Sequence, residues 1–252
     1  LPLRLARLDG PGRAPLECCM RFTACLLVSS ALTLPAAAAG PPCCPCVGVS
    51  LGDPRVAAEA LAAAPPRQDG ARLYVRWPVP VDTEGVGADQ AVAVAEAGGT
   101  PWPVLLFSSA PPLSEHDEEL AFELARVARL AAASPPLTHF EIGWAHPVTT
   151  AEGLRDYAYL LKRSSVTIRG ALASARVLTQ PLPPEPLLLE QLYAEEVAAY
   201  LDGVTVRVTD LEVVAEVRGL LDRLDPGKPL ATVGLELGAD AWKALPGIAG
   251  AA

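Results

Sequence analysis

Short apolar runs alternate with longer amphipathic stretches over most of this chain. The apolar runs have the length of strands, and the stretches between them carry apolar residues three and four positions apart, as helices do. Strands are predicted at residues 47–51, 71–77, 103–109, 138–147, 175–180, 203–208 and 230–237. Helices are predicted at residues 53–64, 88–97, 114–131, 149–168, 187–201 and 209–224. Strand–helix units in this alternation predict an α/β fold with a parallel sheet.

About seven such units are present, and none carries the Gly-rich turn of a dinucleotide-binding fold. The number of units therefore favours a TIM-type (β/α)8 barrel over an open doubly wound sheet. After Gly238 the sequence reads ADAWKALPGIAGAA, in which we recognise no convincing eighth strand. We expect either a chain that is truncated relative to a full barrel or a barrel that is open at this point.

Polar residues and glycines mark the ends of several predicted helices. Ser114 precedes an acidic first turn, and Gly98-Gly99 is typical of a helix C-terminal cap. Capping boxes are predicted for two further helices, by Thr149 with Glu152 and by Thr209 with Glu212. The helix after Ser114 is expected to present its charged residues to solvent, and these are Glu119, Glu123, Arg126 and Arg129.

The predicted strand 138–147 reads THFEIGWAHP and is the stretch around which the other elements are arranged. Alternate side chains of a strand point to opposite faces of the sheet. Phe140, Ile142 and Trp144 therefore share one face, and Glu141 shares the other face with Ala145. In a parallel sheet covered by helices, Glu141 would point inward and the carboxyl end of the strand would open toward ligand.

Composition limits the classes of protein to which the chain can belong. Its 252 residues are 51% hydrophobic and 19% charged, which is enough apolar material for a substantial core and argues against disorder of the whole chain. The net charge of -9 and the pI near 4.9 leave no basic stripe, so nucleic acid is not an expected partner.

A segment beginning at Met20 has the pattern of a secretory signal peptide. Arg21 is followed by an apolar run and then by four alanines that supply a cleavage site. The predicted organisation is upstream read-through at 1–19, a signal peptide at 20–39, a Cys/Pro-rich linker at 40–45 and a barrel domain at 46–252. The mature protein is expected to be secreted or periplasmic, with no membrane attachment after cleavage.

Only three cysteines would remain after cleavage, and all lie near the mature N-terminus: Cys43, Cys44 and Cys46. No cysteine follows them, so no disulfide is expected within the body of the fold. Cys43 and Cys46 have C-x-x-C spacing, but no second pair or histidine cluster completes a zinc site. A metal or redox role for this pair is kept as a minor alternative, and no metal or other cofactor is predicted.

From about Arg72 to Gly238 the chain resembles the clan of retaining (β/α)8 glycoside hydrolases, the glycosidase superfamily. The resemblance rests on the order of several short motifs, namely Phe140-Glu141-Ile142-Gly143-Trp144-Ala145-His146-Pro147, Tyr157–Lys162, Ala175–Leu178 and Lys228–Gly238. Arg76 also follows the second strand where many members of the clan carry an arginine. The resemblance implies a carbohydrate partner, either an oligosaccharide or a polysaccharide.

The same resemblance implies two site positions at the carboxyl ends of the strands. Glu236, near the end of the seventh strand, corresponds to the catalytic nucleophile of the clan. On the fourth strand the clan reads F-E-I-W-N-E-P, so Ala145 stands where the acid/base glutamate is expected and Trp144 stands where an asparagine is expected. Retaining glycosidases need two carboxyl groups roughly 5–5.5 Å apart, and a methyl group transfers no proton.

Three other residues are candidates for the site, each with a structural alternative. Glu141 precedes Ala145 by about 13 Å along a strand, so it is interpreted either as substrate-binding or as a buried carboxylate paired with an arginine such as Arg76. His146 could be a relocated acid, or a loop residue that supports the site. Trp144 could stack on a sugar, or pack in the core.

Two main hypotheses follow. In the first, the chain is a secreted, glycoside-hydrolase-like protein with impaired catalysis, a pseudoenzyme that binds glycan through Arg76, Trp144 and Glu141 or has a structural role. In the second, it is an active glycosidase with Glu236 as nucleophile and His146 as the acid. The sequence does not name the sugar or the linkage.

Overall fold

A computed structural model of the chain describes residues 22–25, 46–50, 73–83, 87–133, 137–208 and 211–233. The strands are β1 (Phe22–Cys25), β2 (Cys46–Ser50), β3 (Leu73–Pro80), β4 (Thr100–Phe107), β5 (His139–Trp144), β6 (Arg176–Thr179), β7 (Val204–Arg207) and β8 (Leu230–Val233). The helices are α2 (Ala88–Glu96), α3 (Glu118–Ala132), α4 (Ala151–Ala171), α5 (Pro186–Ala194), the 3₁₀ helix η2 (Ala198–Tyr200) and α6 (Leu211–Leu224). The predicted helix at 53–64 lies outside the described residues.

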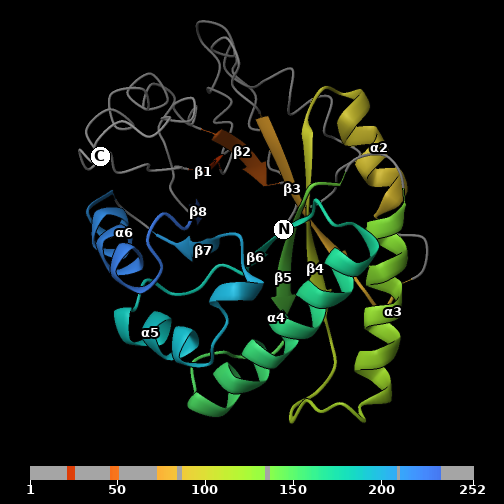
Figure 1. Ribbon diagram of the computed structural model, residues 1–252. Helices are drawn as coiled ribbons and strands as arrows, with labels where there is room; N and C mark the ends of the chain where they lie inside the picture. Colours follow the sequence, from red (N-terminus) through yellow and green to blue (C-terminus); the bar gives the residue numbers. More distant parts are fainter. Residues whose placement is uncertain are drawn as a thin grey trace, which may run out of the picture.

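The strands from β3 to β8 alternate with helices, and every pairing described among β2 to β8 is parallel. Five of them, β2 to β6, follow one another in the sheet in the order of the sequence. Parallel neighbours need a crossover, and the helices that provide it lie around the outside of the strands (Figure 1). The predicted α/β fold with a parallel sheet is therefore confirmed.

The hydrogen-bonded ladder is interrupted on both sides of β7 and β8. These two strands form a separate parallel pair, which isolated bridges join to the β6 region, Leu178 with Gly203 and Leu182 with Val206. On its other side, β8 lies next to β1 without an assigned pairing. Among the described residues the sheet is not closed, so a complete barrel is not established.

Side chains from both sheets nevertheless meet on one inner face. Tyr74 of β3, Trp102 of β4, Leu178 of β6 and Ala231 of β8 form a small buried apolar cluster. The opposite face of the strands carries Val75 and the other members of the main core, which the helices cover. Each strand therefore separates a narrow interior from a large helix-covered core, as the alternation of its side chains requires.

Strand β1 comes from the segment interpreted as a signal peptide. Phe22–Cys25 pairs antiparallel with β2, in register from Phe22 with Val49 to Cys25 with Cys46. The sequence pattern predicts no strand in this segment. Processing of the chain is untested by this pairing and stays a prediction.

Strand β3 is longer than the sequence predicts, because it continues through two prolines. Val81 N–H donates to the Leu106 carbonyl oxygen of β4, so the backbone N–H and C=O groups of the odd-numbered residues of β3 point toward β4. Pro78 and Pro80 face the other way, toward β2, whose pairing with β3 ends at Arg76. Neither proline therefore removes a hydrogen bond from the ladder with β4, which is why the strand can include both.

Two predicted helix starts are wrong by a few residues. Helix α4 is capped by Thr150, whose hydroxyl accepts from the Gly153 N–H, and not by Thr149. Helix α3 is capped by Asp117, whose carboxylate accepts from the Leu120 N–H, and not by Ser114. In both helices the residue directly before the first turn is itself a good cap, and it takes that position.

The predicted C-terminal cap of α2 is confirmed. Gly98 has φ 82°, the left-handed conformation that favours glycine. Gly98 N–H donates to the Ala95 carbonyl and Gly99 N–H to the Val94 carbonyl, which is the pairing of a Schellman motif. By contrast, the predicted helix at 187–201 is wrong as one element, since α5 ends at Ala194 and a turn through Glu196, with φ 57°, separates it from η2.

Within the described part of the chain, none of the helices combines the length and apolar character that crossing a bilayer would require.

Candidate functional site

The inner face of the parallel strands carries a buried ion pair, between β3 and β5. Arg76 Nε donates to Glu141 Oε2 at 2.7 Å, and Arg76 Nη2 donates to Glu141 Oε1 at 2.5 Å. The Glu141 side chain has no exposed surface, whereas 17% of the Arg76 side chain is exposed. This two-point contact is the structural pairing that the sequence analysis proposed for Glu141.

Electrostatics explain why both charges persist in this position. Burial alone would lower the pKa of Arg76, but the charge and the hydrogen bonds of Glu141 outweigh it and raise that pKa above its ordinary value. Both oxygens of Glu141 are used by one guanidinium, so the carboxylate has little capacity left for another partner. The pair therefore fixes β3 against β5, although no direct ladder joins these strands.

Ala145 follows β5 directly and is exposed at the carboxyl end of the strand. Its N–H donates to the Phe107 carbonyl oxygen at the end of β4, so the backbone is still held in register there. Before it, Gly143 is closely packed: a Cβ at this position would lie 2.7 Å from Leu106 Cδ2 and 3.3 Å from the Leu105 carbonyl oxygen, so the Leu106 side chain would have to move. The position that the resemblance assigns to an acid/base glutamate is thus ordered and carries only a methyl group.

His146 is partly exposed beside Ala145. Its Nε2 lies 3.3 Å from the Ser108 carbonyl oxygen, and its ring lies 5.1 Å from the ring of Trp144. If Nε2 is protonated and donates this hydrogen bond, Nδ1 is unprotonated and can accept a proton.

Trp144 points into the helix-covered core. Only 6% of its surface is exposed, and its Nε1 donates to the Ser109 carbonyl oxygen at 2.9 Å. The ring therefore offers little surface to a sugar, and the geometry is that of a packed core residue.

A buried carboxylate that the sequence analysis missed lies behind this edge of the sheet. Glu123 of α3 is 1% exposed, and its Oε1 accepts from the N–H and the hydroxyl of Ser108, at 2.7 and 2.8 Å. Its Oε2 accepts from the hydroxyl of Ser109 and, at 3.4 Å, from the Ser109 N–H. Glu123 thus anchors the loop after β4 whose carbonyl oxygens contact Trp144 and His146.

The prediction that Glu123 and Arg126 belong to a solvated face is wrong. Glu123 lies three residues after Leu120 and four before Val127, and this spacing places it on the buried stripe of α3. Arg126 is partly buried and donates through Nη1 to the carbonyl oxygens of Val81 and Asp82. The helical spacing of Glu123 indicates that it is buried, but its charge favours the opposite prediction of an exposed residue.

Tyr157 of α4 joins β5 to β6 from the helix side. Its hydroxyl donates to the Ile142 carbonyl oxygen at 2.8 Å and accepts from the Gln180 N–H at 2.7 Å. Gln180 Oε1 in turn accepts from the Trp144 N–H. Burial raises the pKa of Tyr157 well above its ordinary value, so the hydroxyl stays neutral and keeps both hydrogen bonds.

The proposed nucleophile is not described by the structure. Strand β8 ends at Val233, and Glu236 lies outside the described residues, as do Cys43 and Cys44. Arg76 and Glu141 are brought together, and Trp144 and His146 lie at the carboxyl end of β5, the strand that also carries Glu141. In the described ranges no group of three histidine, cysteine or acidic side chains could hold a metal ion.

No protein-family model and no curated protein sequence matches the chain. Among solved structures, the chain is weakly similar to β-glucuronidases of Bacteroides uniformis. A calcium-binding mutant of β-glucuronidase 2 matches with 14% identity and a TM-score of 0.46, over 64% of this chain and 20% of that one. β-Glucuronidase 2 covalently bound to cyclophellitol-6-carboxylate aziridine matches with 12% identity and a TM-score of 0.43, over 62% and 20%.

A further β-glucuronidase structure from this organism matches with 11% identity and a TM-score of 0.46, over 70% of this chain and 21% of that one. The chain thus spans about a fifth of the length of the solved structures it matches.

Proposed function

We propose that this chain is a glycoside-hydrolase-like protein of the (β/α)8 type that binds carbohydrate at the carboxyl ends of its strands. We further propose that ordinary double-displacement hydrolysis is impaired. The observation that carries the proposal is Ala145, an exposed methyl group at the end of β5 where the resemblance requires a proton donor.

The chemistry of retaining hydrolysis explains why a single position matters so much. One carboxylate attacks the anomeric carbon while a second carboxyl group protonates the leaving oxygen and later activates water. Proton transfer of this kind contributes about 10²–10⁴-fold to the rate. A site with Glu236 as the nucleophile and Ala145 at the acid/base position would keep the first function and lose the second.

Glu141 is a poor replacement for the missing acid. It precedes Ala145 by about 13 Å of strand at roughly 3.3 Å per residue, too far to reach the same oxygen. Its carboxylate is fully buried and both oxygens are bound by Arg76. Releasing it would leave an unpaired buried charge, which costs far more than exposing a surface carboxylate.

A second candidate function is an active glycosidase in which His146 acts as the acid. Two observations favour His146 over other described side chains: it is adjacent to Ala145 and partly exposed. Its hydrogen bond to the Ser108 carbonyl, together with the Glu123 network behind Ser108, would hold the ring in one orientation. Secretion of the protein stays part of the proposal, on the strength of the segment at 20–39.

Unactivated glycosides separate the two functions, because their leaving groups need protonation by an acid, whereas the leaving groups of activated aryl glycosides need little acid assistance. The first candidate predicts saturable oligosaccharide binding with no turnover of unactivated glycosides. The second predicts turnover of both classes of substrate, lost in Glu236→Ala and reduced on unactivated substrates in His146→Ala.

The assay is a panel of aryl glycosides, with isothermal titration of oligosaccharides in parallel. A folded wild-type protein that neither turns over an aryl glycoside nor binds any oligosaccharide of the panel would remove both candidates. Circular dichroism of each variant establishes that loss of signal does not reflect loss of the fold.

A further inference from the structure

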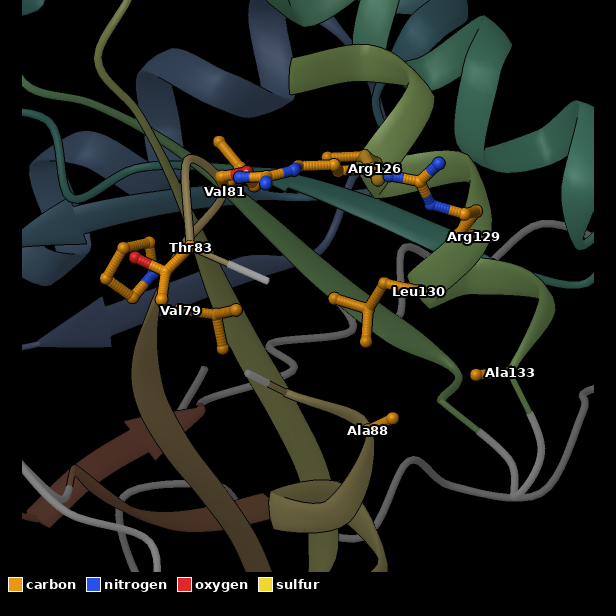
Figure 2. Close-up of a pocket in the computed structure, with 10 residues that line it drawn as sticks. Val79, Val81, Thr83, Ala88, Arg126, Arg129, Leu130 and Ala133 are labelled. Carbon is orange, nitrogen blue, oxygen red and sulfur yellow. The ribbon is translucent and has the colours of Figure 1, made fainter. Parts of the chain in front are cut away.

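A pocket lies between α2, α3 and the end of β3, with a volume of about 440 Å³ (Figure 2). Its walls are mainly apolar, formed by Val79, Val127 and Leu130 among others. Val79 is on the opposite face of β3 from Arg76, since odd- and even-numbered side chains alternate along a strand. Val79 and Val81 belong to the helix-covered core, so the pocket lies mainly on that side of β3 and not on the side that carries Arg76.

Two arginines of α3 lie along one side of this apolar pocket (Figure 2). Arg126 is held in place by the carbonyl oxygens of Val81 and Asp82 and forms part of the wall. Arg129, one turn further along the helix, is exposed. None of the described residues that line the pocket is acidic, although the chain as a whole has a net charge of -9.

We propose that this pocket binds an amphiphilic monocarboxylate, with the carboxylate on the Arg129 guanidinium and the hydrocarbon body between Val79 and Leu130. Pockets of this size suit small organic ligands, and such sites combine apolar walls with a few polar groups that fix orientation. A guanidinium binds a carboxylate through two parallel hydrogen bonds, which a neutral or cationic head group cannot reproduce.

Isothermal titration of decanoate below its micelle-forming concentration tests the proposal, with decanol and decyltrimethylammonium as the neutral and cationic comparisons. We expect decanoate to bind at least tenfold more tightly than either. Arg129→Glu should weaken decanoate binding at least tenfold, and Arg129→Lys should weaken it less. Ala133→Phe, which fills the pocket without changing its charge, should also weaken it tenfold or more.

The matched control is Arg163→Glu, which makes the same charge change at an exposed arginine of α4 and should leave the affinity within about twofold. Circular dichroism is recorded for every variant. Equal affinity for decanoate and decanol, equal effects of Arg129→Glu and Arg163→Glu, unchanged affinity in Ala133→Phe, or no decanoate binding to the folded wild type would each overturn the proposal. None of these results depends on whether the chain binds sugar.

Discussion

The Arg76–Glu141 pair concentrates two opposite charges in a largely buried interior. Replacing Glu141 with Gln keeps the shape but leaves the Arg76 charge without its carboxylate. Removing one partner of a buried pair typically costs about 3–5 kcal/mol, so we predict that Glu141→Gln lowers the free energy of unfolding by about that amount. Urea denaturation followed by circular dichroism measures it.

Two further variants show whether the loss comes from the unpaired charge. The double variant Arg76→Met, Glu141→Leu removes both charges and should be less destabilised than Glu141→Gln. Arg155→Met breaks an exposed pair with Glu195, at 3.9 Å, and should cost less than about 1 kcal/mol. A Glu141→Gln protein as stable as Arg155→Met would contradict the structural role of the pair.

Glu123 supports the loop after β4 through four hydrogen bonds from Ser108 and Ser109. Glu123→Ala leaves these buried donors without an acceptor, and each such loss costs about 1–3 kcal/mol. We predict a destabilisation of about 3 kcal/mol or more by urea denaturation. Glu119→Ala, on the exposed side of the same helix, is the matched control and should change stability by less than about 0.5 kcal/mol.

For individual residues, the sequence predicts the Arg76–Glu141 ion pair better than it predicts the burial of a single charged residue such as Glu123. The partner of Glu141 could be named because a buried carboxylate needs a cation and Arg76 falls on the inner face of a nearby strand. Glu123 was missed because glutamates are rarely buried, and its serine partners lie in a loop whose path the sequence does not fix. The spacing to Leu120 and Val127 was the available signal.

The start of a helix is set by its N-cap residue. In α4, two neighbouring threonines can be compared directly as the N-cap. Thr150 accepts from the Gly153 N–H, so Thr150→Ala should lower the free energy of unfolding by about 1 kcal/mol. Thr149 is exposed and lies one residue earlier, so Thr149→Ala should have almost no effect. Thermal and urea denaturation of the two variants, side by side, decide which threonine is the cap.

Comparing Thr149→Ala with Thr150→Ala tests a typical error in predicting helices from sequence, in which the start of the helix is placed one residue too early. Thr149 with Glu152 satisfies the spacing of a capping box, yet the first turn begins one residue later. Similarly, the second strand was predicted to end at residue 77, yet β3 continues to Pro80, because its prolines face away from the ladder with β4. Periodicity located the strands and helices, while their ends depended on neighbouring elements.

Alkaline pH is expected to weaken the fold as a whole, in part through Tyr193. Burial, and then the charge and hydrogen bond of Asp225, raise the pKa of Tyr193 above its ordinary value of 10.0. Above pH 10 the unfolded chain loses a proton that the folded chain keeps, so the free energy of unfolding falls as pH rises. The slope contributed by one such group is at most about 1.4 kcal/mol per pH unit.

Tyr193→Phe removes this group and should make the decline above pH 10 shallower, while its stability near neutral pH changes little beyond the loss of one weak hydrogen bond at 3.4 Å. Urea denaturation at a series of alkaline pH values gives both slopes. Equal slopes for the wild type and the variant would mean that Tyr193 does not contribute.

For the whole molecule, the alternation of strands and helices predicted the parallel α/β arrangement correctly. It did not predict how the ends of the sheet meet. Closure depends on contacts between distant segments, such as β8 beside β1, and no local pattern specifies them. Strand β1 was missed for a further reason, because its apolar run has the pattern of a signal peptide and was excluded from the fold.

For the whole site, we propose a carbohydrate-binding mouth in which the proton donor expected at Ala145 is missing. Ala145→Glu supplies that donor, and Ala145→Gln supplies the same shape without the proton. Turnover of unactivated oligosaccharides, measured for the wild type and both variants, tests the claim most directly. We expect turnover by Ala145→Glu to exceed that of the wild type and of Ala145→Gln at least about a hundredfold, and to be abolished when Glu236→Ala is added. A wild-type protein that already hydrolyses these substrates at the rate of Ala145→Glu would contradict it.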